Sequence, residues 1–132
     1  MSRHPGTKKS LGQHFLRDGN MIRKIVDAIP ADPKDKVIEI GPGSGALTEI
    51  LADRFSDLSV IEIDRRMVEY LVERFPGLDI IQEDVLKTDW NLLLNTNKSV
   101  HVVGNLPYYI TSQILFGLLS SRKKISTALL MM

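Results

Sequence analysis

The sequence contains no cysteine, and its three histidines, His4, His14 and His101, are scattered along 132 residues. The absence of cysteine excludes disulfides, thiolate metal sites, iron–sulfur clusters and cysteine nucleophiles. Because the histidines are few and far apart in the chain, we expect no metal site. A chain without cysteine also suits a reducing compartment, so we expect a cytoplasmic protein.

Long apolar runs are absent as well. No segment approaches the roughly 18 consecutive apolar residues that a membrane span needs, and the charged N-terminus, MSRHPGTKKS, has no apolar stretch behind it. We therefore expect neither membrane insertion nor secretion. Hydrophobic residues make up 43% of the chain and charged residues 25%, which is close to globular averages and argues against intrinsic disorder.

The formal net charge of +1 hides an uneven distribution. Residues 1–24 contain six basic side chains and one acidic side chain, whereas the remainder carries 11 basic and 15 acidic ones. A basic N-terminal arm, which we assign to residues 1–17, can supply the phosphate attraction with which nucleic-acid binding begins. A solvated terminus without a ligand explains the same charges.

Short β-branched apolar runs alternate with helical patterns, which predicts an α/β fold with a mainly parallel sheet and helices on both faces. The expected strands are Val37–Ile40, Leu58–Ile63, Leu78–Ile81, Val100–Val103 and Ile125–Met132. The expected helices are Asp18–Ile29, Ala46–Phe55, Arg65–Phe75 and Thr111–Leu119. Because the chain has the length of one domain and no long linker, we assign residues 18–132 to a single domain.

A glycine-rich turn, GPGSG at residues 41–45, joins the first expected strand to a helix. Glycines there allow a sharp turn and let a ligand approach main-chain N–H groups. Glu62 follows Gly41 by 21 residues, at the end of the second strand, where a carboxylate can accept both hydroxyls of a ribose. These features predict a nucleotide or nucleoside site. A dinucleotide-dependent oxidoreductase stays open, because Gly41-x-Gly43-x-x-Ala46 also satisfies the dinucleotide pattern.

Two further features favour S-adenosylmethionine as the cofactor. Glu39 precedes the turn by two residues and completes the pattern E-x-G-x-G-x-G, which resembles motif I of class I methyltransferases. Asp84, after the third strand, is positioned to accept the exocyclic amine of an adenine. A loop acid or the cap of a following turn explains Asp84 equally well when it is taken alone. Because it lies in register with Gly41 and Glu62, we assign it to binding.

The segment Asn105-Leu106-Pro107-Tyr108 follows the fourth strand and resembles the N-[LIP]-P-[YF] motif of methyltransferases that act on ring-conjugated amino groups. Such a nitrogen is a poor nucleophile because its lone pair is delocalised into the ring. The Asn105 side-chain oxygen and the Leu106 carbonyl can each accept one N–H of the amine. Pro107 fixes the turn, and Tyr108 offers a ring on which the base stacks. The alternative is a structural β-turn whose tyrosines cover the sheet edge.

Across most of its length, the chain resembles the bacterial small-subunit ribosomal RNA adenine dimethyltransferase family. The matching stretches are Lys9–Leu16, Glu39–Gly45, Val60–Asp64, Gln82–Asp84 and Asn105–Tyr109. The first stretch contains a G-Q-[HN]-F-L element, which narrows the match to this family and its antibiotic-resistance relatives. His101, which alternates with apolar residues inside a strand, we interpret as a satisfied core residue.

The resemblance implies S-adenosylmethionine-dependent methylation of two adjacent adenosines to N6,N6-dimethyladenosine near the 3′ end of small-subunit ribosomal RNA. The implied partner is the assembling pre-30S particle, and we expect a monomer. By position, the resemblance assigns cofactor contacts to His14, Leu16, Gly41, Gly43, Gly45, Glu62, Asp84 and Asn105, and target-base contacts to Asn105, Leu106, Pro107 and Tyr108. It also implies that part of the basic arm, Lys8–Leu16, folds over the cofactor as a lid.

Members of this family are longer, and the present sequence stops inside its expected fifth strand. Because an apolar strand at a chain end leaves an exposed edge, we expect a Rossmann-like class I methyltransferase domain that is truncated there and lacks the helical RNA-binding domain. Cofactor binding is then expected to survive, but not RNA methylation. A non-enzymatic RNA-binding module is the alternative from another class, supported by the basic arm and Arg122-Lys123-Lys124.

Overall fold

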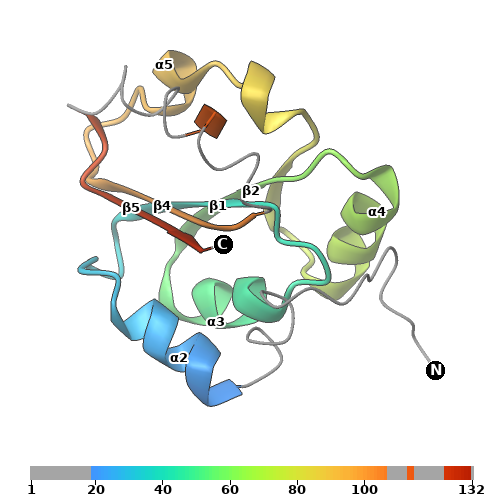
Figure 1. Ribbon diagram of the computed structural model, residues 1–132, viewed down its shortest axis with the longest axis horizontal. Coiled ribbons are helices and arrows are strands. Elements are labelled where there is room, and N and C mark those ends of the chain that lie inside the picture. Colours follow the sequence, from blue (N-terminus) through green and yellow to red (C-terminus); the bar gives the residue numbers. More distant parts are fainter. Residues whose placement is uncertain (1–18, 107–112, 115–123, 132) are drawn as a thin grey trace.

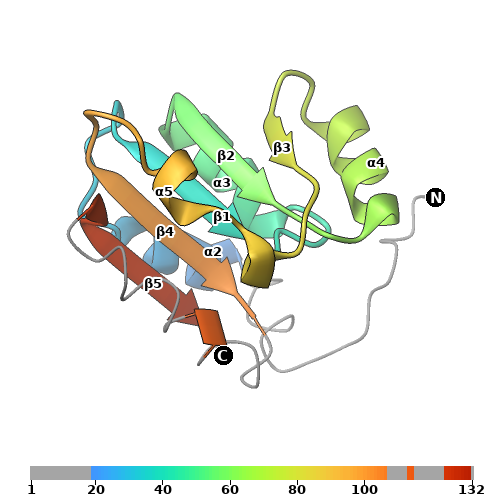
Figure 2. The same cartoon turned by 90° about the horizontal axis from the view of Figure 1, so that it is seen from above.

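Five parallel strands form the centre of the computed structural model, which describes residues 19–106, 113–114 and 124–131. They are β1 (Lys36–Ile40), β2 (Asp57–Ile61), β3 (Asp79–Ile81), β4 (Val100–Asn105) and β5 (Thr127–Met131). Their order is β3-β2-β1-β4-β5, and each neighbouring pair is parallel (Figure 2). The chain therefore winds outward in one direction from β1 and then in the other from β4. Ligands of open α/β sheets bind at such a reversal, outside the carboxyl ends of the strands.

Helices cover both faces of this sheet, as the apolar strands predict. Helices α2 (Gly19–Asp27) and α3 (Ala46–Arg54) lie on one side, and the short α5 (Trp90–Leu93) lies on the other (Figure 1). Helix α4 (Arg65–Arg74) adds Leu71 to the core that α2 and α3 form. Because side chains alternate along a strand, Val37 of β1 joins that core, whereas Ile38 packs in the opposite one with Trp90.

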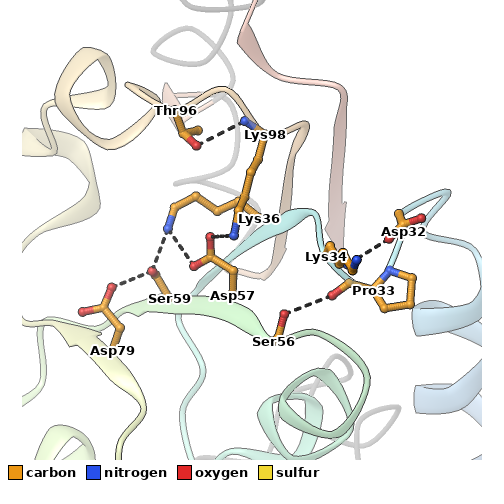
Figure 3. Close-up of polar contacts among 10 residues, drawn as sticks. All are labelled: Asp32, Pro33, Lys34, Lys36, Ser56, Asp57, Ser59, Asp79, Thr96 and Lys98. Atoms are coloured by element: carbon orange, nitrogen blue, oxygen red, sulfur yellow. Dashed lines mark hydrogen bonds and ion pairs between the residues drawn. The ribbon is translucent and has the colours of Figure 1, made fainter.

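A polar network ties the amino ends of the strands together (Figure 3). Lys36 Nζ lies 3.3 Å from Asp57 Oδ1 and donates to Ser59 Oγ at 3.2 Å. Ser59 donates to Asp79 Oδ2 at 2.6 Å, and Lys98 Nζ donates to Asp57 Oδ2 at 2.9 Å. The hydrogen bond from Lys98 lowers the pKa of the Asp57 carboxyl, with a further contribution from Lys36. The charged side chains at this end of the sheet are thus engaged with one another.

The expected fold class is confirmed, and the differences lie at the ends of elements and in short ones. Strand β2 stops at Ile61 rather than at residue 63, because Asp64 caps α4 by accepting the N–H of Arg66. The 3-10 helix η1 (Val85–Lys87) and α5 were missed, and an aspartate side chain caps each of them. The expected helix at 111–119 lies outside the described residues except for positions 113–114, which are helical.

His101 is buried in β4, as expected, but only one of its ring nitrogens is satisfied by the described residues. Its Nε2 lies 2.9 Å from Asp35 Oδ2, whereas Nδ1 is buried without a hydrogen-bond partner there. The bond from His101 holds the pKa of Asp35 below its usual value. The interpretation of His101 as a fully satisfied core residue is therefore corrected in this detail. In the described part of the chain, no helix has the length and apolarity to cross a membrane.

Candidate functional site

The glycine turn at residues 41–45 leads from β1 to α3 at the carboxyl edge of the sheet. Gly43 and Gly45 adopt positive φ angles of 56° and 91°, in the left-handed region that costs other residues roughly 1–2 kcal/mol. The N–H of Gly41 donates to the Ile61 carbonyl of β2 at 3.0 Å. The N–H of Gly45 donates to the Pro42 carbonyl at 3.0 Å and closes the turn.

The three glycines of the turn differ in whether neighbouring side chains leave room for a Cβ atom. A Cβ added at Gly45 would lie 2.8 Å from Phe75 Cε2, and one at Gly41 would lie 3.2 Å from Leu106 Cδ2. A Cβ at Gly43 would meet nothing within 4 Å. Gly41 and Gly45 are therefore explained by close packing, whereas the main chain at Gly43 is open to an approaching molecule.

Glu62, the predicted ribose acceptor, lies directly beside this turn. Its Oε1 accepts the N–H of Gly43 at 3.3 Å, and its Oε2 accepts the N–H of Asp64 at 3.0 Å. The residue is 9% exposed, so the carboxylate is held in place by its packing as well as by these two bonds. Since each carboxylate oxygen has two lone-pair sites, both oxygens can still accept a hydroxyl.

Glu39 lies beneath the turn and contacts α3. It is 2% exposed, and its Oε1 accepts a 2.5 Å hydrogen bond from Thr48 Oγ1. The pKa of Glu39 is raised to about 8, chiefly by burial and to a smaller extent by the nearby charge of Glu62, while the hydrogen bond from Thr48 opposes the rise. The raised pKa favours the neutral form of Glu39, and its hydrogen bond with Thr48 joins β1 to α3. The sequence marked Glu39 as part of a motif but did not reveal this partner.

Asp84 follows β3 and is half-buried. Its Oδ1 accepts the N–H of Leu86 at 3.0 Å and caps η1, which is the structural role that the sequence left open. No other hydrogen bond to this side chain occurs within the described ranges, so Oδ2 is available there. Two apolar side chains at this edge were not predicted as site residues: Ile63 and Leu86 are 61% and 46% exposed. Because Ile63 was assigned to a buried strand from the sequence, the exposure of its side chain was not predicted.

Asn105 and Leu106 bring the end of β4 against the glycine turn. Asn105 is half-buried, and its carbonyl oxygen lies 3.7 Å from a Cβ built on Gly41. Leu106 is 9% exposed and packs in the core with Ile38. Its buried side chain therefore anchors the start of the segment that was predicted to hold a target base. The other predicted residues of the site, His14, Leu16, Pro107 and Tyr108, lie outside the described residues.

The predicted residues that the structure describes thus gather at one edge of the sheet. They are Gly41, Gly43, Gly45, Glu62, Asp84, Asn105 and Leu106, and they follow or end β1, β2, β3 and β4. Together they provide two carboxylates, an amide and open main chain, which suit hydroxyl and amine groups. Across the same described ranges, no group of three or more acidic or histidine side chains is arranged to hold a metal ion.

Comparison with known sequences gives consistent matches. The family model described as ribosomal RNA adenine dimethylase matches residues 6–132. A ribosomal RNA small subunit methyltransferase A from Prosthecochloris aestuarii is 43% identical over 125 residues, which cover 95% of this chain and 48% of that relative. The relative of the same name from Salinibacter ruber is 48% identical over 126 residues, covering 95% and 43%. The chain therefore spans slightly less than half the length of these curated relatives.

Solved structures agree with these matches. The 23S ribosomal RNA methyltransferase ErmE superposes with a TM-score of 0.75 and 34% identity, over 88% of this chain and 46% of that one. A dimethyladenosine transferase from Plasmodium falciparum has a TM-score of 0.70 and 29% identity, over 84% and 40%. The expected Rossmann-like fold of class I methyltransferases is thereby confirmed. With a family model that matches nearly its whole length, the chain belongs to the ribosomal RNA adenine dimethylase family.

Proposed function

We propose that this chain forms the S-adenosylmethionine-binding part of a ribosomal RNA adenine-N6 dimethyltransferase. The observation that carries the proposal is the hydrogen bond from the Gly43 N–H to the Glu62 carboxylate. The main chain at Gly43 is open, and this turn lies at the same edge of the sheet as Asn105, the last residue of β4. This contact supports the proposal, because the Glu62 carboxylate can accept ribose hydroxyls and lies beside main chain that a nucleoside could approach.

Each residue at this edge of the sheet is assigned to a different part of the cofactor. Glu62 would accept the ribose hydroxyls, and the main chain of Gly41, Gly43 and Gly45 would contact the cofactor. Asp84, whose Oδ2 accepts no hydrogen bond from the described residues, would accept the adenine amine, and Ile63 would provide an exposed apolar surface for the base next to Glu62. Part of the basic arm, Lys8–Leu16, would then close over this site as a lid and bring His14 and Leu16 to the cofactor. Bound S-adenosylmethionine supplies a methyl group on a sulfonium, which is already an excellent leaving group.

The protein's contribution to methyl transfer is alignment. The Asn105 side-chain oxygen and the Leu106 carbonyl accept the two N–H groups of the target amine and favour its pyramidal, nucleophilic form. Pro107 fixes that carbonyl, and Tyr108 stacks on the target base. Because the displacement is in line with the sulfonium, it needs correct placement more than a general base. No catalytic carboxylate or imidazole is assigned beside this segment.

The names of the relatives guide the proposed substrate. Proteins called ribosomal RNA small subunit methyltransferase A match 95% of this chain, which supports small-subunit ribosomal RNA as the substrate. Within that RNA, we assign the target that the motif resemblance implies, two adjacent adenosines near the 3′ end of 16S ribosomal RNA. The substrate particle is then a pre-30S subunit in the cytoplasm, and the enzyme acts as a monomer. The part of the relatives beyond this match is the proposed source of further RNA contacts, so cofactor binding is the function assigned to these 132 residues alone.

Isothermal titration with S-adenosylhomocysteine tests the cofactor assignment directly. The 132-residue chain should bind this product analogue and should not bind NADH, which is the ligand of the competing oxidoreductase interpretation. Binding of NADH alone would replace the proposal, and binding of neither ligand would remove it.

Transfer of labelled methyl groups to unmethylated small subunits tests the reaction. We expect activity from a chain extended to the length of the relatives and none from residues 1–132. If the extended chain binds small-subunit RNA with strong salt dependence but transfers no methyl group, the non-enzymatic RNA-binding interpretation is correct instead.

A further inference from the structure

Arg74, the last residue of α4, reaches across to the glycine turn. Its Nη1 donates to the Ser44 carbonyl oxygen at 2.8 Å, and its Nη2 donates to Glu49 Oε2 at 2.7 Å. Its guanidinium also lies over the Phe75 ring, 5.1 Å from the centroid. One side chain therefore connects the end of α4, the first turn of α3 and the turn between β1 and α3.

These contacts fix the peptide group that joins Ser44 to Gly45. Its carbonyl oxygen is held by Arg74, and its N–H donates to the Pro42 carbonyl at 3.0 Å. Phe75, the residue after Arg74, also restrains this peptide, because its ring occupies the space beside Gly45. Because both polar groups of this peptide are hydrogen-bonded, rotation of the peptide would break two hydrogen bonds, one of which is supplied by Arg74.

The carbonyl bond differs in kind from the ion pair that accompanies it. The Glu49 side chain is 64% exposed, and exposed ion pairs contribute little because water competes for both partners. The Arg74 side chain is 31% exposed and is further held by the Phe75 ring. Of the two bonds, only the one from this charged donor to the Ser44 carbonyl is made to the turn itself, so we expect that bond to hold the turn.

We propose that Arg74 is a positioning residue for cofactor binding, which holds the Ser44–Gly45 peptide and thereby keeps the glycine turn in its binding conformation. The proposal rests on the proposed function, because it concerns the affinity of that same site for S-adenosylmethionine and its product. Arg74 has no proposed contact with the cofactor. It acts through Ser44, and Glu62 acts on the same turn from β2.

Isothermal titration of S-adenosylhomocysteine into four variants of the chain tests this role. Arg74→Ala should raise the dissociation constant about tenfold, which corresponds to about 1.4 kcal/mol. Arg74→Lys retains one charged donor and should recover about half of that loss on a logarithmic scale, which leaves its dissociation constant about threefold above that of the unchanged chain. Glu49→Ala removes the ion pair but leaves the carbonyl bond, so its dissociation constant should stay within about twofold of the unchanged chain.

Arg54→Ala is the matched control. Arg54 forms an ion pair with Asp27 and lies at the other end of α3, so its loss should lower thermal stability without changing affinity. The proposal is overturned if Arg74→Ala binds normally, if Glu49→Ala weakens binding as much, or if Arg74→Lys gives no rescue. An equal loss of affinity in Arg54→Ala would also overturn it, because that would indicate a general effect of stability.

Two further outcomes keep the test decisive. If Arg74→Ala does not fold, Arg74→Lys carries the comparison and should bind more weakly than Glu49→Ala; equal binding by these two variants overturns the proposal. If the unchanged chain does not bind S-adenosylhomocysteine at all, the proposed function fails rather than the role of Arg74.

Discussion

Glu62 is the residue on which the proposed site depends most. Its two oxygens accept N–H groups from the glycine turn and from Asp64, so one carboxylate orders both segments that border the site. Glu62→Gln replaces one acceptor oxygen with an amino group, which faces either a main-chain N–H or a ribose hydroxyl. We expect the dissociation constant for S-adenosylhomocysteine to rise at least about tenfold, since a hydrogen bond to a charged group is worth roughly 1.5–3 kcal/mol.

Glu69→Gln provides the comparison for this titration. Glu69 lies on the exposed side of α4, where it pairs with Arg65, and its loss should leave the affinity unchanged. Equal affinities of the Glu62 and Glu69 variants would show that the Glu62 carboxylate does not contact the cofactor.

Single residues also show where sequence reasoning about the site succeeds and where it stops. The spacing of Glu62 from Gly41 predicted their proximity, because strands of a parallel sheet end at the same edge. The capping bond of Asp84 and the exposure of Ile63 depend on where each strand ends to within one or two residues. Apolar periodicity does not determine that limit. The partner of Glu39 depends on helix packing across the sheet, which one strand's pattern cannot specify.

Among the elements, the turn between β1 and α3 requires glycine at two positions for different reasons. At Gly45, a side chain meets Phe75 and an unfavourable φ together, whereas at Gly43 it meets the unfavourable φ and open space. Gly45→Ala should therefore destabilise the fold by more than the roughly 1–2 kcal/mol of left-handed backbone. Gly43→Ala should cost about that amount of stability but weaken S-adenosylhomocysteine binding strongly, because its methyl group occupies the open side.

Urea unfolding and isothermal titration of both variants check this division. A Gly43→Ala chain that binds as tightly as the unchanged protein would mean that the cofactor does not approach the turn at this point. A smaller loss of stability in Gly45→Ala than in Gly43→Ala would mean that Phe75 moves aside without cost.

The longer elements were predictable because their periodicity extends over several residues. Helix α4 and strands β1 and β4 show it clearly, and their expected limits differ from the observed ones by at most two residues. Segments of three or four residues, such as η1 and α5, are too short to show a period. What forms them is local capping by Asp84 and Asp89, together with burial of Trp90, and these require knowledge of the packed core.

In the molecule as a whole, the amino ends of the strands contribute to stability and the carboxyl ends form the proposed binding site. Lysine and aspartate side chains bond one another across the amino ends of the strands, whereas the carboxyl ends present the proposed site (Figures 2 and 3). The order of strands follows from pairing between distant segments, such as β1 with β4, and the apolar pattern of a strand does not name its neighbours. The class of fold was therefore predictable, while its topology came from the structure.

The dependence of stability on pH should reflect both ends. The pKa of Asp57 is lowered in the folded chain, so its contribution is present at neutral pH and is lost as pH falls through the acid range. The pKa of Glu39 is raised from 4.5 to about 8, which has the opposite sign. The unfolded chain releases this proton near pH 4.5, but the folded chain retains it until about pH 8. Stability should therefore decline as pH rises across that interval.

Replacing Glu39 with glutamine isolates this term. Glutamine can accept the hydrogen bond from Thr48 but cannot ionise, so Glu39→Gln should abolish a decline in unfolding free energy of at most about 1.4 kcal/mol per pH unit between pH 5 and 8. Urea titrations of both chains at pH 5, 7 and 9 measure the difference, in which all other titrating groups cancel. The unfolding free energy of the glutamine variant should increase relative to that of the unchanged chain from pH 5 to 7 and again from pH 7 to 9. A constant difference would show that Glu39 is already ionised at neutral pH, with its charge held beside Glu62 beneath the glycine turn.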